Sequence, residues 1–368
     1  MKFLVERAAL LETVSRLQKV VGAKTTMPVL EGILISAEQG KITLAAYNLE
    51  MGMKKEIYAS CEEEGDIVIN AKLLSEILRR MNGIQVEIEA DSRLMCHIRS
   101  GEAVFDIMGM AASDFPEMPS VAEGTKLSLD GEVLCDMVRG TIFAVAQTEG
   151  SRPILTGLNL SVKDGVLQLV AIDGYRLAIR RQKVDLDIDA EFVVSGRALS
   201  EAVKLISEDT ESVDITVGGR LICFNIDGYV FISRLLEGEF VNFEKIIPAE
   251  YSQRIKVSSH DIINTIERVS LLISETFTTP VRCIFSEDNT VFSCATSMGR
   301  ATETFLAELE GEPFEIGLNS RYLLEALRAC DTERVQIRFN GSNSGVLILS
   351  GDDNDNDFLY LIMPMRLK

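Results

Sequence analysis

Residues 68–74 read VINAKLL, and the same plan returns twice further along the chain. The second copy is VVSGRAL at Val193–Leu199, and the third is IGLNSRYL at Ile316–Leu323. Each copy is an apolar run that passes through small or polar residues into a helical pattern, so each predicts a strand leading into a short helix. Three similar stretches in one chain indicate an internal repeat.

Two other landmarks keep the same spacing. The apolar start at Phe3, which precedes a helical pattern, recurs 124 and then a further 128 residues along the chain. A proline followed by an apolar residue at Pro28 recurs after 125 and then a further 127 residues. Three landmarks in one order indicate three tandem units of about 125 residues. We expect domains at 1–120, 125–246 and 250–368, separated by short Pro-containing and acidic joints.

Each unit has two helical patterns among several strands. The predicted helices are residues 7–21, 71–82, 131–146, 196–207, 259–273 and 320–330. Alternation of Val86 and Ile88 with Glu87 and Glu89 predicts a strand, and Asp227-Gly228 predicts a hairpin turn. Runs of strands with few helices indicate an α+β fold, with two helices per unit packed on largely antiparallel sheets.

The charge is unevenly distributed over these elements. The 368 residues carry a net charge of −19, which argues against a simple basic nucleic-acid surface and against docking on anionic lipid. The six predicted helices carry +4, and the remainder carries −23. Solvated helix faces often favour Lys and Arg, but a shared helical face of this kind would also suit non-specific contact with phosphates.

Motifs for catalysis or metal binding are missing. The sequence contains no common phosphate-binding loop or nucleophile motif, and its two histidines, His97 and His260, are more typical of surface or core positions. Asp353–Asp357 begins like a calcium loop but lacks the later Gly and Glu, so a hairpin tip is expected. Seven scattered cysteines and a charged N-terminus fit a reduced, cytoplasmic protein. We predict no catalytic residue, no metal and no cofactor.

Two further segments carry a family resemblance. Asp173–Leu177 reads DGYRL, and Met363–Leu367 reads MPMRL. Together with the three tandem units, these motifs resemble the bacterial sliding clamp, the beta subunit of DNA polymerase III. The resemblance covers the whole chain. The resemblance implies a non-catalytic processivity subunit made of three clamp domains. It also implies a head-to-tail homodimer that closes into a six-domain ring, with helices lining a channel for duplex DNA.

The same resemblance implies a groove that binds short linear peptides of the polymerase alpha subunit, the clamp loader, other polymerases and repair proteins. The matching residues are Leu155, Ile172, Gly174, Tyr175, Arg176, Leu177, Val241, Lys245, Ile246, Phe277, Asn319, Tyr322, Leu361, Ile362, Met363, Pro364, Met365 and Arg366. Leu, Ile and Met walls would form an adaptable apolar pocket, and Arg176, Asn319 and Arg366 would hold the peptide backbone. Leu155, Leu177 and Ile362 also suit a purely structural role in the core.

The resemblance further implies residues for DNA and for the ring joint. We expect DNA contacts at Lys24, Arg79, Arg80, Arg152 and Arg197. The joint would pair Phe105 and Ile107 of one subunit with Leu271 and Leu272 of the other. The sequence departs from the family at Ile172, often Thr, and at 241–245, where the family often has PDYRR. Pro153-Ile154 replaces an aromatic pair of some relatives, so stacking of single-stranded template is not expected there.

Two alternative hypotheses stay open at the level of the sequence. The first is a hydrolase that uses carboxylates such as Asp173, which predicts a pair of carboxyl groups with shifted pKa in a pocket. The second is a repeat scaffold that binds only proteins, or a plasmid- or phage-borne variant of the clamp.

Overall fold

The computed structural model describes residues 1–22, 25–147, 152–273, 279–287, 289–352 and 357–367. Its contacts divide the chain into two compact units. Unit 1 comprises Met1–Glu132 and Arg197–Leu235, and unit 2 comprises Val133–Gly196 and Leu236–Lys368.

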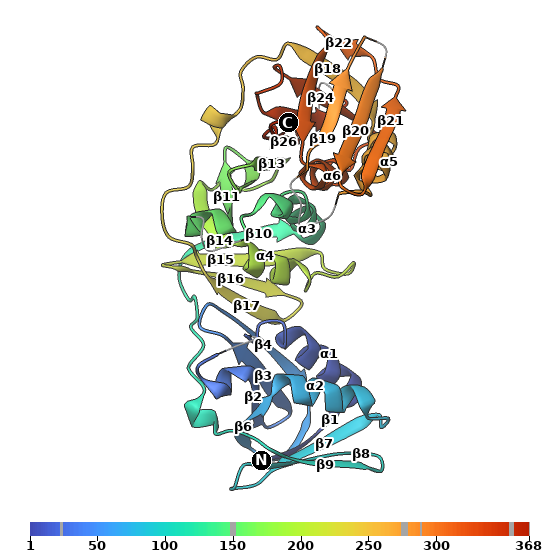
Figure 1. Ribbon diagram of the computed structural model, residues 1–368. Coiled ribbons are helices and arrows are strands. Elements are labelled where there is room, and N and C mark those ends of the chain that lie inside the picture. Colours follow the sequence, from blue (N-terminus) through green and yellow to red (C-terminus); the bar gives the residue numbers. More distant parts are fainter. Residues whose placement is uncertain (23–24, 148–151, 274–278, 288, 353–356, 368) are drawn as a thin grey trace. The chain divides into compact units, whose positions relative to one another are not determined.

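The helices confirm the predicted pattern of two per repeat. They are α1 (Arg7–Leu17), α2 (Ala71–Arg80), α3 (Gly131–Arg139), α4 (Gly196–Val203), α5 (Ser259–Ser270) and α6 (Ser320–Arg328). In unit 1, α1 packs against α2, and in unit 2, α5 packs against α6 (Figure 1). All six end earlier than predicted. After α3, for example, the Thr141 hydroxyl donates to the Met137 carbonyl, and the chain passes into the 3₁₀ turn Ile142–Ala144.

The repeated stretch forms the junction that the sequence predicts. Strand β6 (Gly65–Asn70) leads into α2, β14 (Ala190–Ser195) into α4, and β23 (Phe314–Leu318) into α6. The Asn70 side chain caps α2 by accepting from the Leu73 backbone N–H, and Asn319 caps α6 in the same manner. These side chains satisfy backbone donors that the first helical turn leaves unpaired.

The proline landmark is also structural. Pro28 and Pro153 each begin a 3₁₀ turn, Pro28–Glu31 and Pro153–Thr156, that leads into a strand. Because proline fixes φ near the helical value and lacks an N–H, it is well suited to the first position of such a turn. The first two repeats therefore enter their second strand in the same way.

Unit 1 contains two sheets. The larger has the order β10 (Thr125–Asp130), β15 (Ser212–Gly218), β16 (Leu221–Ile226), β17 (Tyr229–Arg234), β4 (Met51–Tyr58), β3 (Lys41–Tyr47), β2 (Gly32–Glu38), β6. The smaller has the order β5 (Ser60–Glu63), β1 (Lys2–Glu6), β7 (Gln85–Ala90), β8 (Met95–Ser100), β9 (Ala103–Met108). Asp227 and Gly228, with φ of 48° and 75°, form the predicted hairpin turn between β16 and β17. Neighbouring strands are antiparallel throughout.

The first and second repeats share the larger sheet, because β17 pairs with β4. Tyr229 on β17 is buried opposite Lys55 on β4. The Lys55 Nζ lies 4.5 Å from the centroid of the Tyr229 ring, and the Arg16 guanidinium lies 5.1 Å from it. Arg16 also donates to the Leu205 carbonyl at 3.1 Å. Cation–π contacts from α1 and β4, together with this hydrogen bond, thus hold the first repeat to the second.

Unit 2 joins the second and third repeats in the same way. Its larger sheet has the order β14, β11 (Gly157–Lys163), β12 (Val166–Ile172), β13 (Arg176–Lys183), β26 (Phe358–Ile362), β25 (Val346–Ser350), β24 (Arg334–Phe339), β18 (Gln253–Ser258), β22 (Leu309–Glu310). The smaller has the order β21 (Gly299–Phe305), β20 (Thr290–Thr296), β19 (Val281–Phe285), β23. The pairing of β13 with β26 is the contact between the repeats.

All seven cysteines are free, as the sequence suggests, and five are buried. Burial raises the pKa of the Cys96 thiol to about 11, with a smaller contribution from Asp91. A buried thiol of this kind is a small core side chain and a poor nucleophile.

Candidate functional site

An apolar stripe crosses four adjacent strands of unit 2. It consists of the buried residues Val170, Ile172, Leu177, Ile179, Leu347 and Leu361, from β12, β13, β25 and β26. On β12 and β13 these are alternate residues, so they lie on one face of the sheet. Ile172, Leu177 and Leu361 of this stripe are among the residues predicted for the peptide groove.

The linker between β17 and β18 packs onto the stripe. Phe240, Phe243, Ile247 and Tyr251 of the linker contact it, as do Leu155 and Leu359. The linker also carries three of the predicted groove residues. Val241 is half-buried, whereas Lys245 is exposed and Ile246 is 38% exposed. The linker therefore covers part of the stripe and leaves Lys245 and Ile246 accessible.

The C-terminal segment lies beside the stripe. After β26, the Met363 N–H donates to the Tyr175 carbonyl at 2.8 Å, and the Met365 N–H donates to the Gly317 carbonyl at 2.8 Å. Met363 is 38% exposed, Pro364 and Met365 are half-buried, and Arg366 is exposed. Two backbone hydrogen bonds thus hold a short, partly exposed Met-rich segment between β13 and β23.

Arg176 is buried, with 4% of its surface exposed. Its Nε donates to Asp173 Oδ2 at 3.0 Å, and its Nη1 pairs with Glu325 on α6. The guanidinium lies 4.3 Å from the centroid of the Tyr322 ring and 5.5 Å from that of Phe143. Its hydrogen bonds thus go to the chain itself, whereas the sequence suggested a role in holding a peptide backbone.

Asn319 also has a different contact from the one expected. Its Oδ1 accepts from the backbone N–H groups of Arg321 and Tyr322 at 3.0 and 3.3 Å, so this oxygen caps α6. The neighbouring Tyr175 is 64% exposed, and its ring centroid lies 6.4 Å from that of Tyr322. Burial raises the pKa of Tyr322, and the nearby Asp173 raises it further. The Tyr175 ring is therefore an exposed aromatic surface beside the C-terminal segment.

The residues predicted for the groove that the structure describes all lie in unit 2, but some are buried and others are exposed. Leu177, Leu361 and Ile362 are buried in the free chain, Ile172 is 5% exposed, and Leu155 is half-buried. Gly174, with a φ of +91°, lies in the exposed turn before Arg176. Phe277 lies outside the described residues. The accessible members of the set are therefore Lys245 and Ile246 in the linker, Tyr175 and the C-terminal segment.

Sequence reasoning missed several members of the cluster. Phe240, Phe243, Ile247 and Tyr251 in the linker, and Leu347 on β25, contact or belong to the stripe. The one available signal was the spacing of two phenylalanines among polar residues at 239–245, where solvent exposure of both would be unfavourable.

The residues predicted to contact DNA are exposed wherever they are described. Arg79 and Arg80 lie in the last turn of α2, and Arg197 lies in the first turn of α4. Arg152 directly precedes the 3₁₀ turn at Pro153. Lys24 lies outside the described residues. Arginines at the end of α2 also interact favourably with the helix dipole, so their DNA contact stays a prediction.

The residues predicted for the ring joint lie on one edge strand, or follow a helix that packs against another. Strand β9, which carries Phe105 and Ile107, is the last strand of its sheet, and so is β21. Leu271 directly follows α5 and is 79% exposed, and Leu272 is half-buried. Other large apolar side chains near these edges are more than half exposed: Val104, Met108, Met298 and Leu306.

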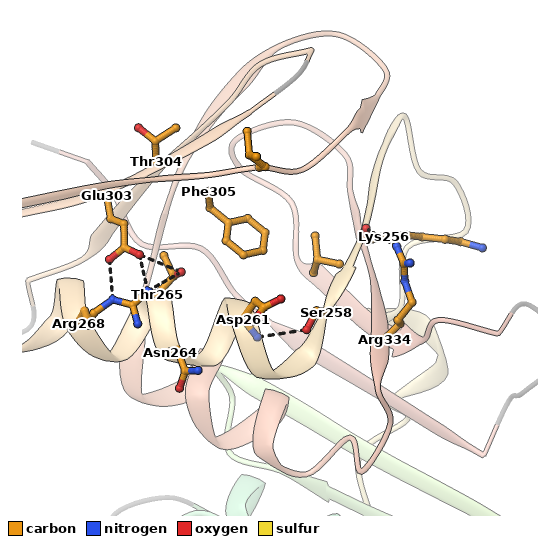
Figure 2. Close-up of a pocket in the computed structure, with 12 residues that line it drawn as sticks. Lys256, Ser258, Asp261, Asn264, Thr265, Arg268, Glu303, Thr304, Phe305 and Arg334 are labelled. Carbon is orange, nitrogen blue, oxygen red and sulfur yellow. Dashed lines mark hydrogen bonds and ion pairs between the residues drawn. The ribbon is translucent and has the colours of Figure 1, made fainter.

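A pocket of about 480 Å³ lies between α5 and β21. Figure 2 shows Glu303 and Phe305 pointing toward α5, whereas Thr304 points away from it. Arg268 on α5 donates to Glu303 at 3.0 Å, and this hydrogen bond lowers the pKa of Glu303 below its usual value. This carboxyl group is therefore held in its charged form, the opposite of what a general acid near neutral pH requires.

Asp173, the carboxylate that the hydrolase hypothesis singled out, is engaged in local structure. It accepts from the backbone N–H groups of Tyr175 and Arg176 and from the Arg176 guanidinium. Among the residues that the structure describes, no group of three or more His, Cys, Asp or Glu side chains could hold a metal ion. None of the helices in the described ranges combines the length and the apolar character needed to cross a membrane.

Comparison with known families decides the identity. The models of the DNA polymerase III beta subunit match residues 1–119 with the N-terminal domain, 128–242 with the central domain and 244–366 with the C-terminal domain. The chain belongs to the DNA polymerase III beta subunit family. Family relatives are alike in length as well as in sequence. The beta sliding clamps of Halalkalibacterium halodurans and Bacillus subtilis are 32% and 31% identical over all of both chains.

Solved structures of the family agree with this fold. The crystal structure of the Bacillus subtilis DNA polymerase sliding clamp covers the whole of both chains with a TM-score of 0.94 and 30% identity. As a member of this family, the chain is a sliding clamp of DNA replication, a processivity factor that binds DNA and the polymerase. It is a non-catalytic subunit, so the family rules out the hydrolase hypothesis and the scaffold that binds only proteins.

Proposed function

We propose that two copies of this chain close head to tail into a six-domain ring around duplex DNA. The observation that carries this proposal is the pair of exposed edge strands with apolar side chains, β9 in unit 1 and β21 in unit 2. An exposed apolar edge strand is a template for pairing with another chain. Pairing β9 of one subunit with β21 of the other, twice, removes these edges and closes the ring.

Apolar contacts would supply most of the energy of this joint. Phe105 and Ile107 on β9 would meet Leu271 and Leu272 beyond α5 of the partner subunit. Burial of apolar surface contributes roughly 25 cal/mol per Å², whereas exposed ion pairs at the rim contribute little. The pocket between α5 and β21 borders this edge, so side chains from a paired strand would reach its rim.

Weak contacts suffice for DNA if the ring holds it by topology. Exposed Arg79, Arg80, Arg152 and Arg197, together with Lys24, would touch phosphates without reading sequence. The mildly basic helices would face the DNA, and the strongly acidic remainder would keep other surfaces away from it. This separation of basic and acidic surfaces explains how a protein with a net charge of −19 could bind DNA.

The groove of unit 2 would recruit the polymerase alpha subunit, the clamp loader, other polymerases and repair proteins through short linear peptides. Its support is the apolar stripe, the linker that covers part of it and the partly exposed Met363 and Met365. We also propose domain limits at 1–120, 125–246 and 250–368, near which β10 and β18 begin the second and third repeats. Replication and seven free cysteines suit the cytoplasm.

Primer extension on singly primed circular single-stranded DNA tests the proposal. With a compatible clamp loader, ATP and the replicative polymerase, we expect the chain to lengthen the products of one binding event at least tenfold. The Arg79→Ala/Arg80→Ala/Arg197→Ala variant should need lower salt for the same effect, because it removes phosphate contacts. Products of unchanged length, with a loader shown to hydrolyse ATP on this template, would contradict the proposal.

A further inference from the structure

One carboxylate in unit 2 is shared by two arginines with different surroundings. Glu325 on α6 pairs through Oε2 with the buried Arg176 and through Oε1, at 3.0 Å, with Arg321 one turn earlier on the same helix. The Arg321 side chain is 62% exposed, whereas that of Arg176 is 3% exposed. Glu325 therefore connects a solvent-facing cation on the surface of α6 with a cation beside the groove.

On the groove side, Arg176 holds the turn that anchors the C-terminal segment. Asp173 binds its guanidinium and also accepts from the backbone N–H groups of Tyr175 and Arg176. The Tyr175 carbonyl in turn accepts from the Met363 N–H, and Arg176 is paired with Ile362 across β13 and β26. These hydrogen bonds connect the guanidinium to the turn and, through the Tyr175 carbonyl, to Met363.

The low dielectric around Arg176 strengthens its pairing with Glu325. The guanidinium lies between the rings of Tyr322 and Phe143, largely away from water, where electrostatic interactions are stronger than at the surface. Arg321 draws on the same carboxylate from the solvent side. If a phosphate bound Arg321, Glu325 would pair with Arg176 alone. The stronger Glu325–Arg176 pair would then hold the turn at Asp173 more firmly.

We propose that Glu325 is a positioning residue through which duplex DNA in the channel strengthens peptide binding in the groove. This inference rests on the proposed function, because that function places the exposed face of α6 toward DNA. Arg321 exchanges its bond to Glu325 for a DNA phosphate, Arg176 is then held by Glu325 and Asp173, and Met363 is fixed in the position that the peptide meets. By linkage, the peptide raises the affinity for duplex by the same factor.

Fluorescence anisotropy on the dimer tests this coupling. The probe is a labelled clamp-binding peptide of the polymerase alpha subunit, titrated with and without a saturating 30-base-pair duplex, whose own binding is measured in parallel. We expect about fivefold tighter peptide binding with duplex present, a coupling within the usual range. Glu325→Gln should abolish the difference. Glu267→Gln should keep it, because Glu267 pairs with Arg328 on the exposed surface, whereas Arg176 pairs with Asp173 and Glu325.

The possible results separate the coupling from the function beneath it. Peptide binding that ignores the duplex, or coupling that survives in Glu325→Gln, would overturn the inference and leave the clamp intact. Loss of coupling in both variants would also overturn it, because the cause would then be helix charge in general. A wild-type dimer that bound no peptide, or no duplex, would overturn the proposed groove or DNA contact and the coupling with it.

Discussion

Removal of Met363–Lys368 will abolish binding of a clamp-binding peptide and leave the dimer intact. Strand β26 ends at Ile362, so the truncation keeps the pairing of β13 with β26 and the apolar stripe. It removes Met363, which is 38% exposed, and the half-buried Met365, both of which we propose as apolar contacts of the peptide. Because a few central residues carry most of the energy of such interfaces, we expect an affinity loss of at least about a hundredfold. Isothermal titration calorimetry measures it.

A point variant and a control make this test specific. Met363→Ala/Met365→Ala keeps the backbone hydrogen bonds of the segment and should still weaken the peptide about tenfold or more. Tyr58→Ala removes an apolar side chain that is 94% exposed in unit 1, and it should leave the peptide affinity unchanged. Retention of wild-type affinity by the truncated dimer would refute the groove assignment.

Substitution of the apolar pair beyond α5 should convert the dimer to monomers. In Leu271→Ala/Leu272→Ala, each of the two joints loses two leucine side chains, and full burial of one is worth roughly 1.5–3 kcal/mol. The dissociation constant should therefore rise by at least about a thousandfold. Sedimentation velocity at micromolar concentration measures the change.

The monomer itself should stay folded. Leu271 is 79% exposed in the single chain, so its truncation leaves no cavity in the core. The urea midpoint of the isolated monomer, compared with that of the wild-type chain, provides this control. A second control is Leu49→Ala, which truncates an exposed leucine of unit 1 and should leave the dimer as stable as the wild type. A stable dimer of Leu271→Ala/Leu272→Ala would mean that the joint lies elsewhere.

Local chemistry explains why the repeat was predictable from sequence. A helix that begins directly after a strand needs a side chain to accept its first N–H groups, and Asn70 and Asn319 mark those positions in the first and third repeats. A hairpin of this type favours positive φ at two successive residues, and Asp227-Gly228 provides it. These signals depend only on residues that are neighbours in the chain, so they can be recognised in the sequence without knowledge of the tertiary structure.

The contacts of the groove residues depend on distant partners. Arg176 was assigned to holding a peptide backbone, but Glu325, 149 positions later, and the ring of Tyr322 enclose it. Asn319 was assigned to a peptide, yet its Oδ1 is used by the helix that follows. Phe240 and Phe243 lie in a segment that reads as a polar linker, yet both pack on the apolar stripe. No local pattern specifies these pairings.

Retention on DNA before and after linearisation tests the central claim most directly. The labelled protein is loaded on nicked circular DNA by a clamp loader, the circle is cut once with a restriction enzyme, and release is followed by gel filtration. The ring predicts that the protein stays on the circle and leaves the linear form, because the hold is topological. Equal retention on the circular and linear forms would show ordinary electrostatic binding and contradict the ring.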